Sequence, residues 1–478
     1  METMHERAWR AIPAWLPAAA LLAGTTLAGP MFGGLSRSLF VLGCLACGWY
    51  GWRRGPAAHL QVALTLFAFA PFVRRILDVT LGYDQLGLML VGPLVSLLPA
   101  VVDLIRLLES DRGFPRPVGP IVVVGACVVY AAVLTIVQGH WTEAASEGVK
   151  WGAPLLYALV LSARADRDEL LTAAASAFLV ILPIVGLYGI YQYVDPPRWD
   201  RYWMEFAPIM SVGYPEPFAV RVFSTMNGPA SFATFTMTGL LLVCFLRSGW
   251  ASLLVVSPAA LSLLLSLYRT AWVALLAAVL FSLLFRATRA RASAVMIGFA
   301  IAAIVVVTAT PFADVIMERF STLSDGSQDD SARERLAQYV ELWKSADSTL
   351  FGVGFSGEAA IMQFGSLDAI DGMIIAVWVK MGIVVGMVCL SALVWAAANA
   401  VLATRRDAST GAVMSAAIAC AAMTQIPLAN IASAEVGFLF WTFVMIAPPP
   451  RLDRVPPRRL GAAVRDGALT PPTGRDRA

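Results

Sequence analysis

The sequence predicts an all-α, polytopic integral membrane protein, a bundle of about fourteen transmembrane helices. Its 478 residues are 58% hydrophobic and only 14% charged, far more apolar than a soluble globular chain. Apolar runs of roughly 17–22 residues, the length that crosses about 30 Å of hydrocarbon, recur from one end of the chain to the other. Basic residues fall in alternate connecting segments, as they do in multi-pass membrane proteins.

The apolar runs are centred near residues 20, 45, 66, 95, 128, 155, 182, 238, 259, 277, 303, 386, 420 and 440. The first of them, from about Ala11 to Gly29, follows Arg7 and Arg10 and so resembles a secretory signal. It is longer than the apolar part of such a signal, and further runs follow at once. We therefore expect it to be retained as the first transmembrane helix.

The distribution of charge predicts the orientation. If the N-terminus is cytoplasmic, every inner segment is basic, with Arg7/Arg10, Arg53/Arg54, Arg106/Arg112/Arg116, Arg164/Arg167, Arg247, Arg286/Arg289/Arg291, Arg405/Arg406 and Arg451/Arg454/Arg458/Arg459. This regularity predicts that both termini lie in the cytoplasm. Residues 1–447 then form the transmembrane domain, and the Pro- and Arg-rich residues 448–478 form a disordered basic tail.

The opposite, outer face carries two long loops, residues 195–228 and 311–370, and most of the acidic residues. It also carries arginines against the usual bias: Arg37, Arg74, Arg75, Arg198, Arg201, Arg221, Arg269, Arg319, Arg333 and Arg335. Arg269 stands in a short polar step between two apolar runs. A cation held on this face requires an anionic partner, so we expect the functional site to lie here.

The longer outer loop has a recognisable interior. Ser331 and Glu334 form a capping box. The helix that it opens is amphipathic, with apolar residues at Leu336, Tyr339, Val340 and Trp343. Such a helix either lies on the membrane or covers a cavity. The glycine-rich residues 350–357 that follow lack the strand and helix of a nucleotide-binding unit, so they predict a loop that folds back on the surface.

Cysteines, histidines and a lysine inside an apolar run are residue types that can form disulfides, metal sites or buried charge pairs. All six cysteines lie in apolar runs, which predicts no disulfide framework, and Cys44 and Cys47 are expected to be small packing residues. The three histidines are far apart in the sequence, which argues against a histidine metal site. Lys380 either lines a polar cavity or pairs with a neighbour. Basic residues scattered over many short loops make nucleic acid an improbable partner.

Four short motifs occur in a fixed order: residues 221–233 (RVFSTMNGPASFA), 266–272 (SLYRTAW), 330–343 with 350–355 (LFGVGF), and 371–386 (DGMIIAVWVKMGIVVG). In this order and spacing, about residues 60–445 resemble the O-antigen ligase and polymerase family of bacterial envelope glycosyltransferases. The resemblance implies a GT-C-like transferase in the bacterial inner (plasma) membrane that needs neither metal nor cofactor. It would move a glycan from undecaprenyl pyrophosphate to the hydroxyl of an acceptor sugar on the outer face.

The implied partners are a lipid-linked glycan donor, an acceptor glycan and the lipid bilayer. Whether a chain-length regulator also binds stays open. Family members bind the donor pyrophosphate with outer-face arginines, and the matching positions are Arg221 and Arg269. Asn227 and Tyr268, in the same motifs, are further candidates for substrate contact. Guanidinium groups match phosphate oxygens bidentately, and losing one such donor typically costs about 3 kcal/mol of transition-state stabilisation.

Asp371 is the candidate general base, because a carboxylate can accept the proton of an attacking hydroxyl. Ligases of the family carry His-Asn where this chain has Asp371-Gly372, and an aspartate there is more similar to the polymerase branch. The sequence therefore favours a surface-polysaccharide polymerase. The alternatives are a ligase that moves finished glycan to another acceptor, and a lipid-linked oligosaccharide flippase, against which the concentration of polar sequence in outer loops argues.

Every candidate residue also has a structural explanation. Arg269 can snorkel to lipid headgroups, and Arg221 can form an ion pair with Glu205 or Glu216. Asp371 can cap the helix that follows it. Four further arginines are candidates for substrate contact. Arg74 and Arg75 can instead contact lipid, and Arg333 and Arg335 can instead be solvated charges on a helix face.

Overall fold

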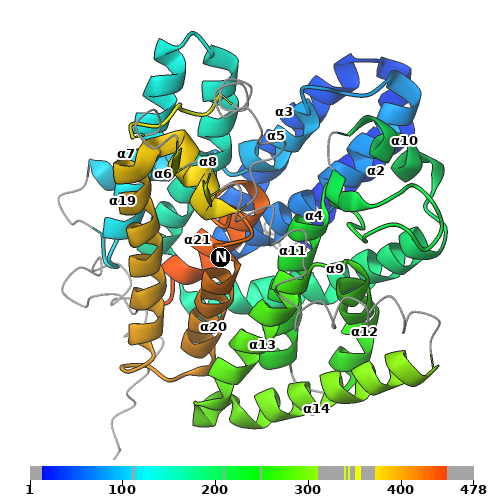
Figure 1. Cartoon of the computed structure of the whole chain (residues 1–478), viewed down its shortest axis with the longest axis vertical. Coiled ribbons are helices and arrows are strands. Elements are labelled where there is room, and N and C mark those ends of the chain that lie inside the picture. Colours follow the sequence, from blue (N-terminus) through cyan, green and yellow to red (C-terminus); the bar gives the residue numbers. More distant parts are fainter. Residues whose placement is uncertain are drawn as a thin grey trace, which may run out of the picture.

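The computed structural model describes residues 13–109, 114–207, 210–247, 250–309, 339–340, 343–344, 350–356 and 372–448. Within these ranges the regular structure is helical, and the only β pairing is a single bridge between Gly213 and Val220. The prediction of an all-helical membrane protein is therefore confirmed (Figure 1). The first half of the long outer loop, the capping box included, and the tail beyond residue 448 lie outside the described residues.

The helices that coincide with the apolar stretches are α2 (Leu16–Ala28), α3 (Leu35–Arg53), α4 (Pro56–Leu81), α5 (Leu88–Val95), α6 (Pro99–Leu108), α7 (Gly119–Val137), α8 (Trp141–Arg164), α9 (Arg167–Val194), α11 (Pro229–Leu246), α12 (Trp250–Leu265), α13 (Arg269–Leu283), α14 (Arg286–Ala309), α19 (Met373–Ala403), α20 (Thr410–Gln425) and α21 (Ala434–Met445). The other described elements are η1 (Gly29–Phe32), α10 (Arg198–Phe206) and η2 (Met210–Val212). Each predicted run centre falls within one helix of the first group.

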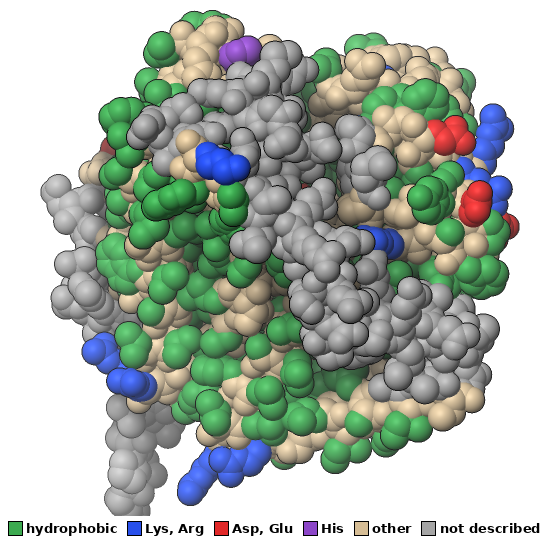
Figure 2. Space-filling model, viewed as in Figure 1, with side chains coloured by type: hydrophobic (Ala, Val, Ile, Leu, Met, Phe, Trp, Pro, Cys, Tyr) green, Lys and Arg blue, Asp and Glu red, His purple; other side chains and the backbone are tan. Residues whose placement is uncertain are grey.

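Four of these helices, α7, α9, α11 and α19, are long and apolar enough to cross a membrane by themselves. The pair α5 and α6, bent by 45° at its break, makes a fifth candidate. The protein is therefore a multi-pass membrane protein. Among the side chains coloured by type in Figure 2, hydrophobic ones far outnumber charged ones, as expected for a surface that meets lipid. A total of fourteen spans remains a prediction.

Helix α9 packs closely against α12 because small residues line the contact. A Cβ atom at Gly186 would collide with the backbone of Ala259, and one at Gly189 would collide with the Ser262 side chain. Small residues at this spacing let two membrane helices approach at backbone distance. On another side of α9, the Phe178 ring meets that of Phe235 from α11 at 5.0 Å. Helix α9 therefore packs against both α12 and α11.

Helix α19 is broken at Gly382, whose φ of 79° is accessible mainly to glycine. The break frees the carbonyls of Val379 and Lys380, which accept hydrogen bonds from the backbone N–H groups of Val353 (2.9 Å) and Gly354 (3.0 Å). The glycine-rich segment of the outer loop thus caps a broken membrane helix. It folds back on the protein, as predicted, and its glycines permit this close approach: a Cβ atom at Gly352 would collide with the backbone of Gly382.

The same segment is also fastened to α7. The backbone N–H of Phe355 donates to Thr135 Oγ1 at 2.6 Å, and Tyr130 donates to the carbonyl of Phe351 at 2.7 Å. Of the predicted amphipathic helix, residues 339–340 and 343–344 are described and helical. The Trp343 ring lies 6.4 Å from that of Trp378 in α19. Residues 350–356 of the long outer loop are therefore docked onto the helical bundle.

At the predicted cytoplasmic face, arginines join neighbouring helices. Arg116 donates to the carbonyls of Ser162 (2.7 Å) and Pro448 (2.9 Å), and Arg167 pairs with Asp407 at 2.8 Å. Burial alone would raise the pKa of the Asp407 carboxyl, but hydrogen bonds from Ser409 and Arg167 hold that pKa below its ordinary value. Asp407 therefore stays ionised and keeps the start of α9 attached to the connection between α19 and α20.

Candidate functional site

The segment 221–228, which contains Arg221 and Asn227, is held by α9 and α12. The amide oxygen of Gln192 accepts hydrogen bonds from the backbone N–H groups of Phe223 (3.0 Å) and Ser224 (2.8 Å). Val222 donates to the carbonyl of Leu265 at the end of α12 (3.2 Å). Ser224 has a φ of 50°, a left-handed conformation that costs a non-glycine residue free energy. Such backbone strain is common at functional sites, where the surroundings enforce it.

Arg75, in α4, holds this segment in place. Its Nε lies 2.8 Å from Oδ1 of Asp200 in α10, and neither side chain has any exposed surface. The guanidinium also donates to the carbonyls of Ser224 and Met226. The side chain lies over the Phe223 ring, 4.9 Å from its centroid. Arg75 therefore joins α4, α10 and the segment 221–228, and its charge is met inside the protein.

Arg74 is likewise engaged by protein groups. Its Nε lies 3.3 Å from Asp78, and it donates to the backbone carbonyl of Asp84 at 2.5 Å. Asp78 also accepts from Arg37 at 2.9 Å, and Arg37 lies 3.9 Å from the Asp84 carboxylate. Two arginines and two aspartates thus offset one another at the ends of α3, α4 and α5. Their mutual neutralisation is consistent with the predicted position of these cations on the outer face, where basic residues are normally depleted.

Arg269 is the first residue of α13 and is half-buried. The residue two positions earlier, Leu267, has a φ of 53°, so this junction also carries a strained backbone. The Tyr268 hydroxyl lies 3.5 Å from the carbonyl of Leu428, between α20 and α21. The bond between Val222 and Leu265 brings the Arg221 segment alongside the same junction. Arg221 is itself half-buried, with its backbone N–H bonded to Val212 at 2.9 Å.

The start of α19 meets the same connection between α20 and α21. Gly372, with a φ of 86°, packs so tightly that a Cβ atom would collide with the Pro427 carbonyl, and Met373 donates to the carbonyl of Ile426 at 3.0 Å. Asp371, the candidate base that immediately precedes Gly372, lies outside the described residues, as do Arg333 and Arg335. Three motif segments, each far from the others in sequence, therefore converge on one region.

A small cavity of about 160 Å³ opens in this region. Its lining combines apolar side chains, Leu86, Leu90 and Val91 among them, with the polar side chains of Asn227, Ser146, Lys150 and Glu435. Oδ1 of Asn227 accepts no hydrogen bond, and Glu435 has no hydrogen-bond or ion-pair partner among the described residues. Lys150, in contrast, donates to Glu147 at 2.7 Å.

Sequence reasoning missed Glu435 and Lys150, although a signal for Glu435 was present. It is the only charged residue between Asp407 and Arg451, and an isolated carboxylate in an apolar stretch is costly unless it serves a site. Lys380, which was singled out for the same reason, is paired: its Nζ lies 3.1 Å from Glu147, the residue that also binds Lys150. This three-residue network links α8 to α19 beside the cavity.

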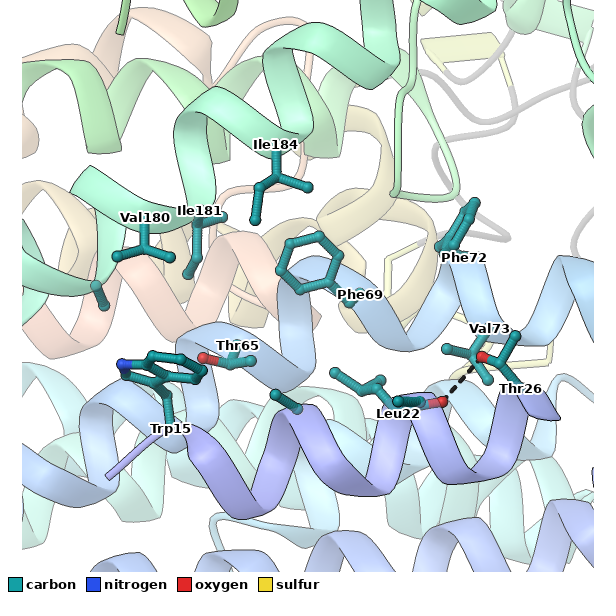
Figure 3. A pocket seen from close by; sticks show the side chains of 13 residues that line it. Trp15, Leu22, Thr26, Thr65, Phe69, Phe72, Val73, Val180, Ile181 and Ile184 are labelled. Carbon is teal, nitrogen blue, oxygen red and sulfur yellow. Dashed lines mark hydrogen bonds between the residues drawn. The ribbon is translucent and has the colours of Figure 1, made fainter. Parts of the chain in front are cut away.

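A second, apolar groove of about 350 Å³ lies between α2, α4 and α9 (Figure 3). Leu22, Phe69 and Ile181 are typical of its lining. Its two hydroxyl groups are already bonded, Thr26 to the carbonyl of Leu22 and Thr65 to that of Gln61, each at 2.8 Å. The groove therefore offers a hydrocarbon surface. At one end, the ring of Phe72 lies 5.9 Å from the Arg75 guanidinium.

Within the described residues, no group of three or more His, Cys, Asp and Glu side chains has the arrangement of a metal site. None of the six cysteines forms a disulfide bond. Cys44 and Cys47 pack with Phe40 and Leu66 in a core between α2, α3 and α4, which confirms their packing role. His59 is buried, with its ring nitrogens 3.1 Å from the Tyr157 hydroxyl and 2.9 Å from the Ser96 carbonyl.

The fold defines a multi-pass helical membrane protein, with a candidate arginine-bearing site at the ends of its helices. Residues 253–390 match the family model described as O-antigen ligase. Three of the four motifs lie within that range and residues 221–233 lie outside it; the match supports the predicted resemblance to an O-antigen ligase and polymerase-like family, and ligase- or polymerase-type enzymatic activity in general. No curated protein matches the chain. Arg269 and Asp371 fall inside the matched range; Arg221, Asn227 and Glu435 fall outside it.

Proposed function

We propose that this protein is a surface-polysaccharide polymerase that acts on the outer face of the bacterial inner membrane. It transfers a glycan from undecaprenyl pyrophosphate to the hydroxyl of an acceptor sugar. The observation that carries the proposal is the convergence of the Arg221 segment, the Arg269 junction and the start of α19. Two arginines of separate motifs thereby come to one region, beside a cavity with polar lining residues.

In the proposed reaction, the acceptor oxygen attacks the anomeric carbon of the donor glycan. The new C–O bond forms as the bond from that carbon to the pyrophosphate oxygen breaks, and the electron pair leaves with undecaprenyl pyrophosphate. Arg221 and Arg269 meet the negative charge that develops on the leaving group. Asp371 takes the proton of the hydroxyl. Tyr268 and Asn227 position substrate, while Arg74 and Arg75 support the site from beneath.

The apolar groove between α2, α4 and α9 is suited to the polyprenyl chain of the donor. Its surface is almost entirely apolar, and Phe72 leads from it toward the Arg75 cluster that supports the Arg221 segment. A lipid tail in this groove would bring its pyrophosphate toward the arginine site. No metal enters this reaction scheme, so EDTA is expected to leave the rate of the purified enzyme unchanged.

The test uses a strain that lacks the gene and carries either the wild-type protein or Arg269→Ala. We expect Arg269→Ala to insert normally, while the long glycan ladder disappears and single lipid-linked repeat units accumulate. Arg198→Ala, which removes an exposed arginine of α10, is the matched control and should keep the ladder. A normal ladder with Arg269→Ala at wild-type protein level would exclude Arg269 from the mechanism.

The same lipid profile separates the competing functions. Long, undelivered lipid-linked chains in the deletion strain would indicate a ligase. Intermediates trapped on the inner leaflet would indicate a flippase. The aspartate at position 371, where ligases of the family carry histidine, favours the polymerase.

A further inference from the structure

We infer that the cavity between Asn227 and Glu435 is the subsite that binds the acceptor sugar, with Glu435 accepting hydrogen bonds from its hydroxyl groups. This inference rests on the proposed function, because it assigns the second substrate of the same transfer reaction. It depends on three observations: the shape of the cavity wall, the unsatisfied polar groups in that wall, and its charge.

A sugar ring has an apolar C–H face and polar hydroxyl groups, and the cavity likewise has both apolar and polar lining residues. Leu86, Leu90 and Val91, apolar lining residues with accessible surface, can meet the C–H face of a pyranose, and other lining residues offer an amide, a hydroxyl and a carboxylate. A volume of about 160 Å³ is well below that of pockets for drug-sized ligands, and suits one sugar ring.

The polar part of the lining has unused hydrogen-bonding capacity. Oδ1 of Asn227 accepts no hydrogen bond, and the Glu435 carboxylate has no partner among the described residues. Buried polar atoms are nearly always satisfied, so the vacancy at Asn227 Oδ1 requires an explanation, and a ligand with several hydroxyl groups supplies it. The Glu435 carboxylate is half-buried and can be reached by the same ligand. Glu435 lies in the first turn of α21, where a carboxylate is favoured by the helix dipole, but it caps none of the backbone N–H groups there.

The charge of the wall argues against a diphosphate in this cavity. Lys150 is the single cation in the lining, and it is already bound to Glu147 at 2.7 Å. The unpaired charge in the wall is the carboxylate of Glu435, which would repel an anion and strengthen a hydrogen bond from a neutral hydroxyl. The sugar and the diphosphate are thus directed to different parts of the site, the first to this cavity and the second to Arg221 and Arg269.

The position of the cavity also suits the acceptor sugar, the second substrate of the proposed reaction. Asn227 lies at the end of the segment that begins with Arg221, so the cavity adjoins the proposed donor site through six residues of chain whose backbone is fixed by Gln192 and Arg75. Across the cavity, Ala434 has a φ of 51°. This conformation is strained for a residue with a side chain, and it sets the entry of Glu435 into α21.

The test measures binding apart from catalysis. The full-length protein in lipid nanodiscs is titrated with the free repeat-unit oligosaccharide, released from the polysaccharide of the host and bearing no lipid or phosphate. Binding is followed by saturation-transfer NMR. We expect Glu435→Gln, which keeps the size of the side chain, to weaken binding by about tenfold, the typical loss for a charge-assisted hydrogen bond, and Asn227→Leu to weaken it by about fivefold, as for a neutral hydrogen bond. Glu216→Gln, the same change at an exposed position of the same face, should bind like the wild type.

Three outcomes would overturn the inference: no binding by the wild type, unchanged binding by Glu435→Gln, or displacement of the oligosaccharide by inorganic pyrophosphate. Arg269→Ala separates this inference from the proposed function. It should still bind the oligosaccharide even though its glycan ladder is lost. If Arg269→Ala keeps the ladder, the proposed donor site fails; if the ladder is lost but Glu435→Gln binds normally, only the acceptor subsite fails.

Discussion

Arg75 and Asp200 form an ion pair without any solvent-exposed side-chain surface, with 2.8 Å between Nε and Oδ1. The pair joins the C-terminal part of α4 to α10, and other guanidinium N–H groups of Arg75 hold the carbonyls of Ser224 and Met226. Asp200 in turn accepts hydrogen bonds from Tyr188 (2.7 Å) and Gln192 (2.6 Å). The conformation of the Arg221 segment thus depends on an arginine that lies beneath the site.

Arg75→Met is therefore expected to destabilise the protein strongly. Removing one member of a buried ion pair leaves the other charge uncompensated, which typically costs about 3–5 kcal/mol. The midpoint of thermal unfolding in detergent should fall well below that of the wild type, and the yield of folded protein with it. Arg198→Met, on the exposed surface of α10, is the control. An Arg75→Met protein that melts like the wild type would show that the pair contributes nothing to the fold.

Gly352→Ala should detach the glycine-rich segment from the break in α19. Gly352 has a φ of 75°, and a Cβ atom there would collide with the backbone of Gly382. The left-handed conformation alone costs a side-chain-bearing residue about 1–3 kcal/mol. We expect lower thermal stability and faster proteolysis of the long outer loop. Gly125→Ala is the control, because that helical glycine of α7 has open space at its Cβ position; equal proteolysis of the two variants would contradict the capping role.

Lys380 and Glu147 should be energetically coupled. Their side chains are about one-fifth exposed and 3.1 Å apart, and hydrogen bonds to charged groups contribute about 1.5–3 kcal/mol. A double-mutant cycle with Lys380→Met and Glu147→Gln is expected to give a coupling free energy near the lower end of this range, because Lys150 partly compensates for the loss of Lys380. Additive effects in the cycle would mean that the pair is incidental. Lys380→Arg should retain most of the stability.

The helical content and the positions of the helices could be read from the sequence, since apolar runs of membrane length are a strong local signal. The break at Gly382 could not, because the residues on both sides of it continue the same apolar pattern and only the docked loop explains the break. The ion pairs could not be predicted from the sequence either. Arg75 finds its carboxylate in a helix far along the chain, so the sequence alone could not separate this supporting arginine from one that faces a substrate.

The motifs identified the region of the site but only part of its lining. Arg221, Asn227, Tyr268 and Arg269 come from segments that do converge. Glu435 and Lys150 belong to no recognised motif, and they join the cavity only because α8 and α21 pack beside α4. An isolated carboxylate in an apolar stretch was the available signal for Glu435, and it becomes meaningful once the cavity is seen.

The last prediction concerns orientation, since every proposed role requires the arginine site to face away from the cytoplasm. The native cysteines are buried or half-buried, so a cysteine introduced at an exposed position should dominate labelling by a membrane-impermeant maleimide. Arg198→Cys, on α10, should react in intact cells whose outer membrane has been permeabilised. Arg405→Cys, on the exposed connection between α19 and α20, should react only after the inner membrane is opened. The reverse pattern would put Arg221 and Arg269 on the cytoplasmic side, where basic residues are ordinary and a lipid-linked donor on the outer leaflet is out of reach.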